Sequence, residues 1–186
     1  MSKKVEFSDF FHQIISFLEK TEVDYLLIGG VAVGVWGRPR LTEDIDFIIF
    51  LPRRNIKNLT KCAESIGLEF KKVPHPQFPE TSIFRITQGI YHADFIIASS
   101  ELEKSALKRK VKIKLFGKNV FVPTKEDLLL LKIIPARKID IFDAENIAQR
   151  HSGKLDEKYL MKWAERLSDE AEDIRIYKEV KRLIRL

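Results

Sequence analysis

Residues 25–50 read YLLIGGVAVGVWGRPRLTEDIDFIIF, and this segment predicts a strand, a helix and a second strand in close succession. An apolar strand ends at Gly29 and Gly30, and a helix of small residues follows. The next strand opens with Asp44 and Asp46, the first of them fourteen residues after Gly30.

The glycine pair and the helix behind it form a candidate phosphate site. Glycine lets the backbone turn sharply and approach a ligand without a Cβ in the way. A helix N-terminus presents free N–H groups and the positive end of the helix dipole, both of which favour phosphate. We therefore expect Gly29 and Gly30 to contact the phosphates of a nucleotide.

The two aspartates form a candidate metal site. Because strand side chains alternate, Asp44 and Asp46 project to one face and Ile45 to the other. Two neighbouring carboxylates repel each other unless a cation lies between them, and ligands that are all oxygen suit Mg²⁺ better than Zn²⁺. The pattern predicts a magnesium ion here, with manganese as a substitute.

A third carboxylate lies in the apolar run of residues 90–97, which we predict to be a strand. Burying the isolated charge of Asp94 would be costly, so this residue is expected to have a cationic partner. If this strand lies beside the strand of Asp44 and Asp46, the three carboxylates can hold two magnesium ions. Taken singly, the glycine pair can be an ordinary turn and the aspartate pair a solvated strand end.

This order of motifs resembles the nucleotidyltransferase superfamily related to DNA polymerase beta, and most of all its small bacterial and archaeal members of the abortive-infection toxin type. The resemblance extends from about residue 25 to residue 151 and includes Lys132, Arg137 and the pair Asp140 and Asp143. Val31 occupies a position at which many members carry a hydroxyl residue.

The resemblance implies a magnesium-dependent transfer of a nucleoside monophosphate from a nucleoside triphosphate (NTP) to a hydroxyl acceptor. It also implies that Lys132 and Arg137 bind the nucleotide; for Lys132 the alternative is a lysine placed to complement the C-terminal dipole of its helix. One of Asp140 and Asp143 would lie near the acceptor or nucleotide, or both would simply complement a helix N-terminus.

The loop before the aspartates contributes further candidates. The guanidinium groups of Arg38 and Arg40 can bind phosphate oxygens in bidentate fashion, or pair with Glu43, or remain surface charges. The Thr42 hydroxyl orients this loop or bonds to the local backbone. His92, two residues before Asp94, is expected to be half-buried and hydrogen-bonded.

Composition narrows the class of protein. The 186 residues carry a net charge of +6, contain one cysteine and include no apolar run of membrane-spanning length, so we expect a cytoplasmic protein without a disulfide framework. The segment 104–125 has eight Lys or Arg and no acid. Its alternating lysines either face an RNA acceptor or guard an edge strand against aggregation.

We predict an α/β protein in which a mixed sheet is flanked by helices, with a catalytic core over residues 1–122 and a helical portion over 123–186. The C-terminal helices are the candidate surface for a protein partner or a homodimer. Strands are expected at 24–28, 45–50, 68–73, 83–87, 90–97, 111–115 and 119–122, and helices at 1–20, 32–36, 54–66, 124–134, 140–150, 156–167 and 169–184, besides a short helix opened by a capping box at Ser100 and Glu103.

The predicted function is a magnesium-dependent nucleotidyltransferase, and the resemblance suggests a role in a toxin–antitoxin pair. Two other classes stay open. One is a nucleotide-binding module in which Val31 marks lost activity, and the other is a nucleic-acid-binding protein that depends on its basic strand.

Overall fold

The computed structural model describes residues 6–51, 56–74 and 82–186. Its elements are, in chain order, α1 (Phe7–Thr21), β1 (Asp24–Ile28), α2 (Gly29–Trp36), β2 (Asp44–Phe50), α3 (Ile56–Ser65), β3 (Phe70–Pro74), β4 (Ser82–Gln88), β5 (Tyr91–Ile97), α4 (Glu101–Lys108), β6 (Val111–Leu115), β7 (Lys118–Val122), α5 (Lys125–Ile133), α6 (Lys138–Arg150), α7 (Glu157–Ala171) and α8 (Ile174–Leu183).

The main sheet confirms the predicted mixed α/β architecture. Its five strands lie in the order β1-β2-β5-β4-β3, and β6 and β7 form a separate hairpin. Strands β2 and β5 run parallel, whereas the other neighbouring pairs are antiparallel. The parallel pair is the one that carries the three aspartates.

Strand alternation gives the sheet two different faces. Apolar side chains of one face, such as Phe47 and Phe95, pack in one core with α1, α3 and the β6–β7 hairpin. On the other face Leu26 and Ile48 pack against α4. Because Asp46 is two residues before Ile48, it projects toward this second face.

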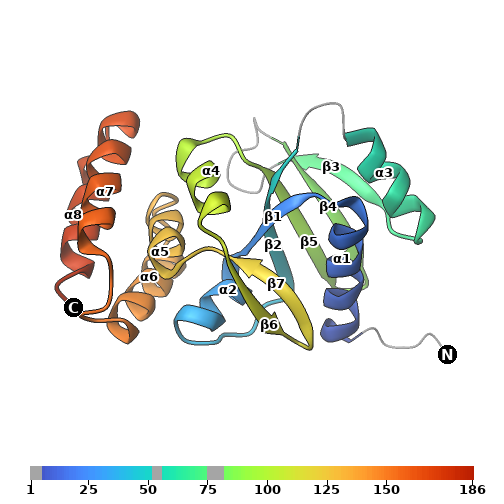
Figure 1. Cartoon of the computed structure of the whole chain (residues 1–186), viewed down its shortest axis with the longest axis horizontal. Helices are drawn as coiled ribbons and strands as arrows, with labels where there is room; N and C mark the ends of the chain where they lie inside the picture. Colours follow the sequence, from blue (N-terminus) through green and yellow to red (C-terminus); the bar gives the residue numbers. More distant parts are fainter. Residues whose placement is uncertain (1–5, 52–55, 75–81) are drawn as a thin grey trace.

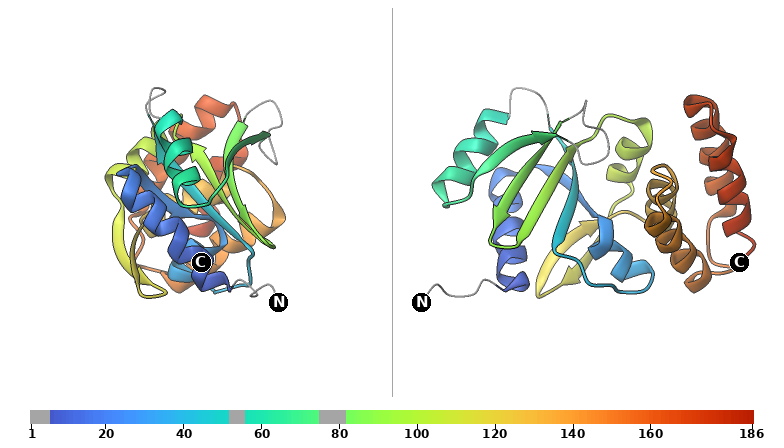
Figure 2. Two further views of the ribbon diagram at one scale, coloured as in Figure 1. Left: turned by 90° about the vertical axis from the view of Figure 1, so that its right-hand side faces the viewer. Right: turned by 180° about the vertical axis from the view of Figure 1, so that it is seen from behind.

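The C-terminal helices extend from one side of the sheet and give the molecule its long axis (Figure 1). Figure 2 shows α7 and α8 outermost, with α5 and α6 between them and the sheet. Helix α2 connects the sheet to the C-terminal helices, because Ala32 and Val33 are buried in the same core as the apolar residues of α5 to α8.

Several predicted boundaries were wrong by one to five residues. Helix α2 begins directly at Gly29, α6 begins at Lys138, and β2 already includes Asp44. The break between the last two helices lies at Glu172, whose φ of 50° ends α7, and not at Ser168. Ser168 is buried in α7 and its hydroxyl accepts a hydrogen bond from Tyr177 N.

Other predicted features are confirmed or lie outside the described residues. The capping box at Ser100 and Glu103 is present. The predicted start of the first helix falls partly on residues 1–5 and that of the third on residues 54–55, both outside the described ranges.

Candidate active site

The predicted carboxylates meet at one end of the sheet. Asp46 pairs in register with Asp94 on β5, and on its other side with Ile28, the last residue of β1. Asp44 is two residues before Asp46 and therefore on the same face. The turn into α2 begins directly after Ile28, so the glycine pair lies against the aspartates.

Gly29 is required at its position for two reasons. Its φ of +65° is rarely adopted by residues with a Cβ, and a Cβ built there would lie 1.9 Å from Asp46 Oδ2. The backbone at the start of α2 is thus in direct contact with the carboxylate. A Cβ on Gly30 would instead lie 3.2 Å from the Arg40 guanidinium.

Asp94 has the cationic partner that its burial requires. Arg85 on β4 donates from Nε to Oδ1 at 2.6 Å and from Nη2 to Oδ2 at 2.7 Å. The sequence analysis did not identify Arg85 as this partner, because its predicted strands 83–87 and 90–97 leave Gln88 and Gly89 as the hairpin turn. In the structure Gln88 pairs with Tyr91, and this register brings Arg85 opposite Asp94.

Asp44 is oriented by two neighbours. His92 Nε2 lies 2.9 Å from Asp44 Oδ1, and the histidine side chain is about a quarter exposed, at 27%. The half-buried histidine predicted from sequence is confirmed. The Thr42 hydroxyl bonds to the backbone N and O of Asp44, which corresponds to the local backbone alternative.

Asp46 is the electrostatically strained member of the group. Burial is the largest cause that raises its pKa, to about 6, and the charges of Asp94 and Asp44 act in the same direction. Lys132 and Arg137 oppose the increase. This opposing effect shows that the cations of α5 and the loop after it lie within electrostatic range of Asp46.

A second charged cluster lies between α2 and the C-terminal helices. Lys132 Nζ lies 2.8 Å from Asp140 Oδ1 and 3.0 Å from Asp143 Oδ2, and all three side chains are buried. Arg137 also pairs with Asp140. Arg40 binds both oxygens of Asp143, each at 3.3 Å, and not Glu43, which was one of the alternatives considered from the sequence.

This cluster gathers three of the predicted nucleotide-binding cations on one side of α2. Asp140 and Asp143 hold Lys132, Arg137 and Arg40 in place, which gives both aspartates a role beyond that of complementing a helix dipole. Arg38 is exposed on the loop before β2.

The basic segment carries less free charge than its composition suggests. Five of its eight cations form ion pairs, namely Lys104 with Glu101, Arg109 with Asp127, Lys110 with Asp24, Lys118 with Glu19 and Lys125 with Glu126. The exposed side chains of Lys112 and Lys114 lie on the outer face of β6.

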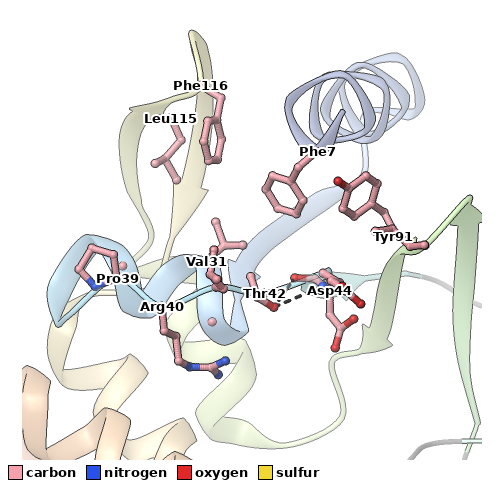
Figure 3. Close-up of a pocket in the computed structure, with 14 residues that line it drawn as sticks. Phe7, Val31, Pro39, Arg40, Thr42, Asp44, Tyr91, Leu115 and Phe116 are labelled. Carbon is pink, nitrogen blue, oxygen red and sulfur yellow. Dashed lines mark hydrogen bonds between the residues drawn. The ribbon is translucent and has the colours of Figure 1, made fainter. Parts of the chain in front are cut away.

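A pocket of about 880 Å³ opens beside Gly30, Thr42 and Asp44. Figure 3 shows aromatic and aliphatic side chains of α1, β5 and the hairpin on one side of it, and the Arg40 guanidinium directed away from them. Phe7, Tyr91 and Phe116 come from these three elements.

The donor set suits a hard divalent cation. Asp44, Asp46 and Asp94 supply oxygen ligands only, and a cation beside Asp46 would offset the burial and the carboxylate repulsion that raise its pKa. Over residues 6–51, 56–74 and 82–186, however, no three His, Cys, Asp or Glu side chains form a preassembled metal site. Mg²⁺ commonly takes only one or two protein carboxylates and completes its shell with substrate phosphates and water.

Several solved structures have a fold similar to that of this chain. The antibiotic-resistance factor ANT(2'')-Ia superposes with a TM-score of 0.61 at 13% identity, over 89% of this chain and 95% of its own. The chain has the fold of the nucleotidyltransferase superfamily.

Two further structures share this nucleotidyltransferase fold. The lincosamide antibiotic adenylyltransferase LnuA matches with a TM-score of 0.52 at 17% identity, over 78% of this chain and 98% of its own. An antigenic nucleotidyltransferase-like protein from Paracoccidioides brasiliensis gives 0.53 at 18% identity, over 94% and 91%. The sequence itself matches no protein-family model and no curated protein.

Among the described residues, no helix is both long and apolar enough to cross a bilayer.

Proposed function

We propose that this protein is a magnesium-dependent nucleotidyltransferase that moves a nucleoside monophosphate from an NTP to a hydroxyl acceptor. The observation that carries the proposal is the position of Asp46. Asp46 lies between the backbone of Gly29 at the start of α2 and Asp94 on the neighbouring strand β5. A phosphate seat and a cation seat are thus adjacent.

The chain offers two kinds of group to the triphosphate. The free N–H groups at the start of α2 face the phosphates at close range, since Gly29 and Gly30 have no side chain. Arg40 lies over Gly30 and supplies a guanidinium beside them. Lys132 and Arg137 add positive electrostatic potential near Asp46. In this proposal Arg38 and Thr42 belong to the same binding loop.

Asp44 and Asp46 would hold the magnesium ion, with Asp94 as the third carboxylate. When bound, the ion neutralises phosphate charge and stabilises the leaving pyrophosphate. The acceptor oxygen forms a bond to the α-phosphorus while the bond to pyrophosphate breaks, and Asp94 favours loss of the hydroxyl proton. Arg85 fixes the orientation of Asp94 for this role. Most of the rate enhancement would come from positioning and charge neutralisation.

The known activities of the structural neighbours support adenylyl transfer as the first reaction to test. One ANT(2'')-Ia structure, with a TM-score of 0.56 at 14% identity, holds adenylyl-2''-tobramycin, and LnuA is an adenylyltransferase. The toxin–antitoxin role, the cytoplasmic location, the division at residue 122 and a partner surface on the C-terminal helices stay predictions from the sequence.

The test measures nucleotide binding and transfer separately. Calorimetry with each NTP, with and without Mg²⁺, reports binding. Incubation with α-labelled NTP, Mg²⁺ and a cell extract shows which fraction becomes labelled. We expect magnesium-dependent binding and a labelled product, and both should be lost in Asp46→Asn.

The same experiment separates the two alternatives. Magnesium-dependent binding without any labelled product would identify a non-catalytic nucleotide-binding module. Two observations favour this alternative. Val31 stands where many members carry a hydroxyl residue, and Asp44 and Asp94 already pair with His92 and Arg85 respectively. RNA binding that survives Asp44→Asn and Asp46→Asn would identify a nucleic-acid-binding protein.

A further inference from the structure

The pocket beside Asp44 has an unusual concentration of exposed apolar side chains on its rim. Leu41 is fully exposed at 101%, Ile90 is 64% exposed and Phe116 is 49% exposed. All three line the same pocket, although they come from three separate loops. Exposed apolar residues that gather around one concave site mark a binding surface rather than ordinary surface scatter.

The aromatic wall of the pocket is held in place by ring contacts. Phe7 packs edge-on against Tyr91 at 5.5 Å and against Phe116 at 5.8 Å, measured between ring centroids. Phe116 also contacts Phe11, at 5.1 Å. The rings join α1, the start of β5 and the tip of the β6–β7 hairpin, so the wall is built before any ligand arrives.

Charge divides the region into two sides. Arg40, Lys132 and Arg137 lie toward α6, bound to its carboxylates. The charged residues that line the pocket are Arg40, Glu43 and Asp44, but the Arg40 guanidinium is paired with Asp143 and directed away from the aromatic wall (Figure 3). A polyphosphate suits the cationic side, whereas the pocket suits a neutral or cationic ligand with an apolar body.

We propose that this pocket binds the hydroxyl acceptor, and that the acceptor is a small molecule with an apolar or aromatic body rather than an RNA end. This inference rests on the proposed function and specifies its substrate class. A volume of about 880 Å³ lies within the range of small-molecule sites. Its polar corner at Thr42 and Asp44 places an acceptor hydroxyl beside Asp44, the one of the three candidate carboxylates that lines this pocket.

The first test uses naphthylethanol, a neutral aromatic alcohol, as the probe in a fluorescence titration with the full chain. Leu41→Ser removes a fully exposed side chain and should not affect folding, yet we expect it to weaken binding several-fold. Phe116→Ser should weaken binding by about tenfold. Phe50→Ser is the matched control, because Phe50 is 50% exposed at the far end of β2, and its affinity should equal that of the parent.

Two companion measurements define the ligand class. Naphthylacetate, which carries a carboxylate in place of the alcohol, should bind more weakly than naphthylethanol because Glu43 and Asp44 repel it. Mg-ATP should bind the parent, Leu41→Ser and Phe116→Ser with equal affinity, and it should not displace naphthylethanol.

Specific outcomes would overturn the proposal. Naphthylethanol that does not bind, or that binds equally well to Leu41→Ser and Phe116→Ser, would show that the pocket is not an apolar acceptor site. Displacement by Mg-ATP would assign it to the nucleotide base. RNA oligonucleotide binding that is lost in both variants would assign it to an RNA end. If Mg-ATP still binds in these cases, only the proposed acceptor class is wrong and the proposed nucleotidyltransferase function stands. If Mg-ATP fails to bind the parent protein, the proposed function itself is wrong.

Discussion

Arg85 and Asp94 face each other across β4 and β5 and form two short hydrogen bonds, 2.6 Å from Nε to Oδ1 and 2.7 Å from Nη2 to Oδ2. Asp94 is buried, and the residue paired with it on the neighbouring strand β2 is another carboxylate, Asp46. The arginine therefore compensates a charge that would otherwise oppose folding. It also makes Asp94 different in kind from Asp46, for which no such partner is seen among the described residues.

This difference predicts opposite effects of two equivalent substitutions. Asp94→Asn should lower the free energy of unfolding by about 1–3 kcal/mol, because it leaves the partly buried Arg85 without its carboxylate. Urea denaturation measures this. In a double-mutant cycle, Arg85→Gln should cost little more once Asp94 is already Asn. An Asp94→Asn variant as stable as the parent would contradict the structural importance of the pair.

Asp46→Asn should instead stabilise the metal-free protein above pH 6. The pKa of Asp46 is raised to about 6 in the folded state, from 3.8. The folded state thus binds its proton more tightly than the unfolded state, and the free energy of unfolding falls as pH rises through this window. Removing the charge should recover about 1–3 kcal/mol at pH 7.5 and almost nothing at pH 3.5.

Thermal unfolding in EDTA at these two pH values measures the effect. Addition of Mg²⁺ provides the control, because it should raise the melting temperature of the parent and leave that of Asp46→Asn unchanged. A variant whose advantage persists at pH 3.5 would indicate a cause other than the carboxylate charge.

Lys132 is predicted to stabilise the fold as well as to contribute charge to the site. Lys132→Met should cost about 3–5 kcal/mol, because it leaves Asp140 and Asp143 buried with less compensation. Lys138→Met, at the start of α6, is the control, since Lys138 is exposed and should change stability by less than about 0.5 kcal/mol. Equal denaturation midpoints for the two variants would refute this role for Lys132.

Gly29→Ala separates backbone strain from contact with the carboxylate. Gly153, with φ of +67° and nothing within 4 Å of its hypothetical Cβ, provides the matched control. Both substitutions incur the cost of a positive φ, roughly 1 kcal/mol. Only Gly29→Ala must also displace Asp46, so it should lose more stability and abolish magnesium-dependent ATP binding. Gly153→Ala should retain ATP affinity in calorimetry, and a Gly29→Ala protein that binds ATP normally would place the nucleotide elsewhere.

The sequence by itself determined the architecture and the carboxylate group. Strand alternation places Asp44 and Asp46 on one face whatever the rest of the chain does, and the apolar run around Asp94 requires both a strand and a cationic partner. These inferences depend on local periodicity and on the cost of burying charge, and both can be read from residue order.

Tertiary structure alone decided which groups meet. The identity of the partner of Asp94 depended on hairpin register, and moving the turn from Gln88–Gly89 to Gly89–Ile90 is what brings Arg85 opposite it. Likewise Arg40 could have paired with the nearby Glu43, but folding brings it to Asp143, 103 residues away. Local sequence carries no information on such contacts, because they depend on how separately formed elements pack.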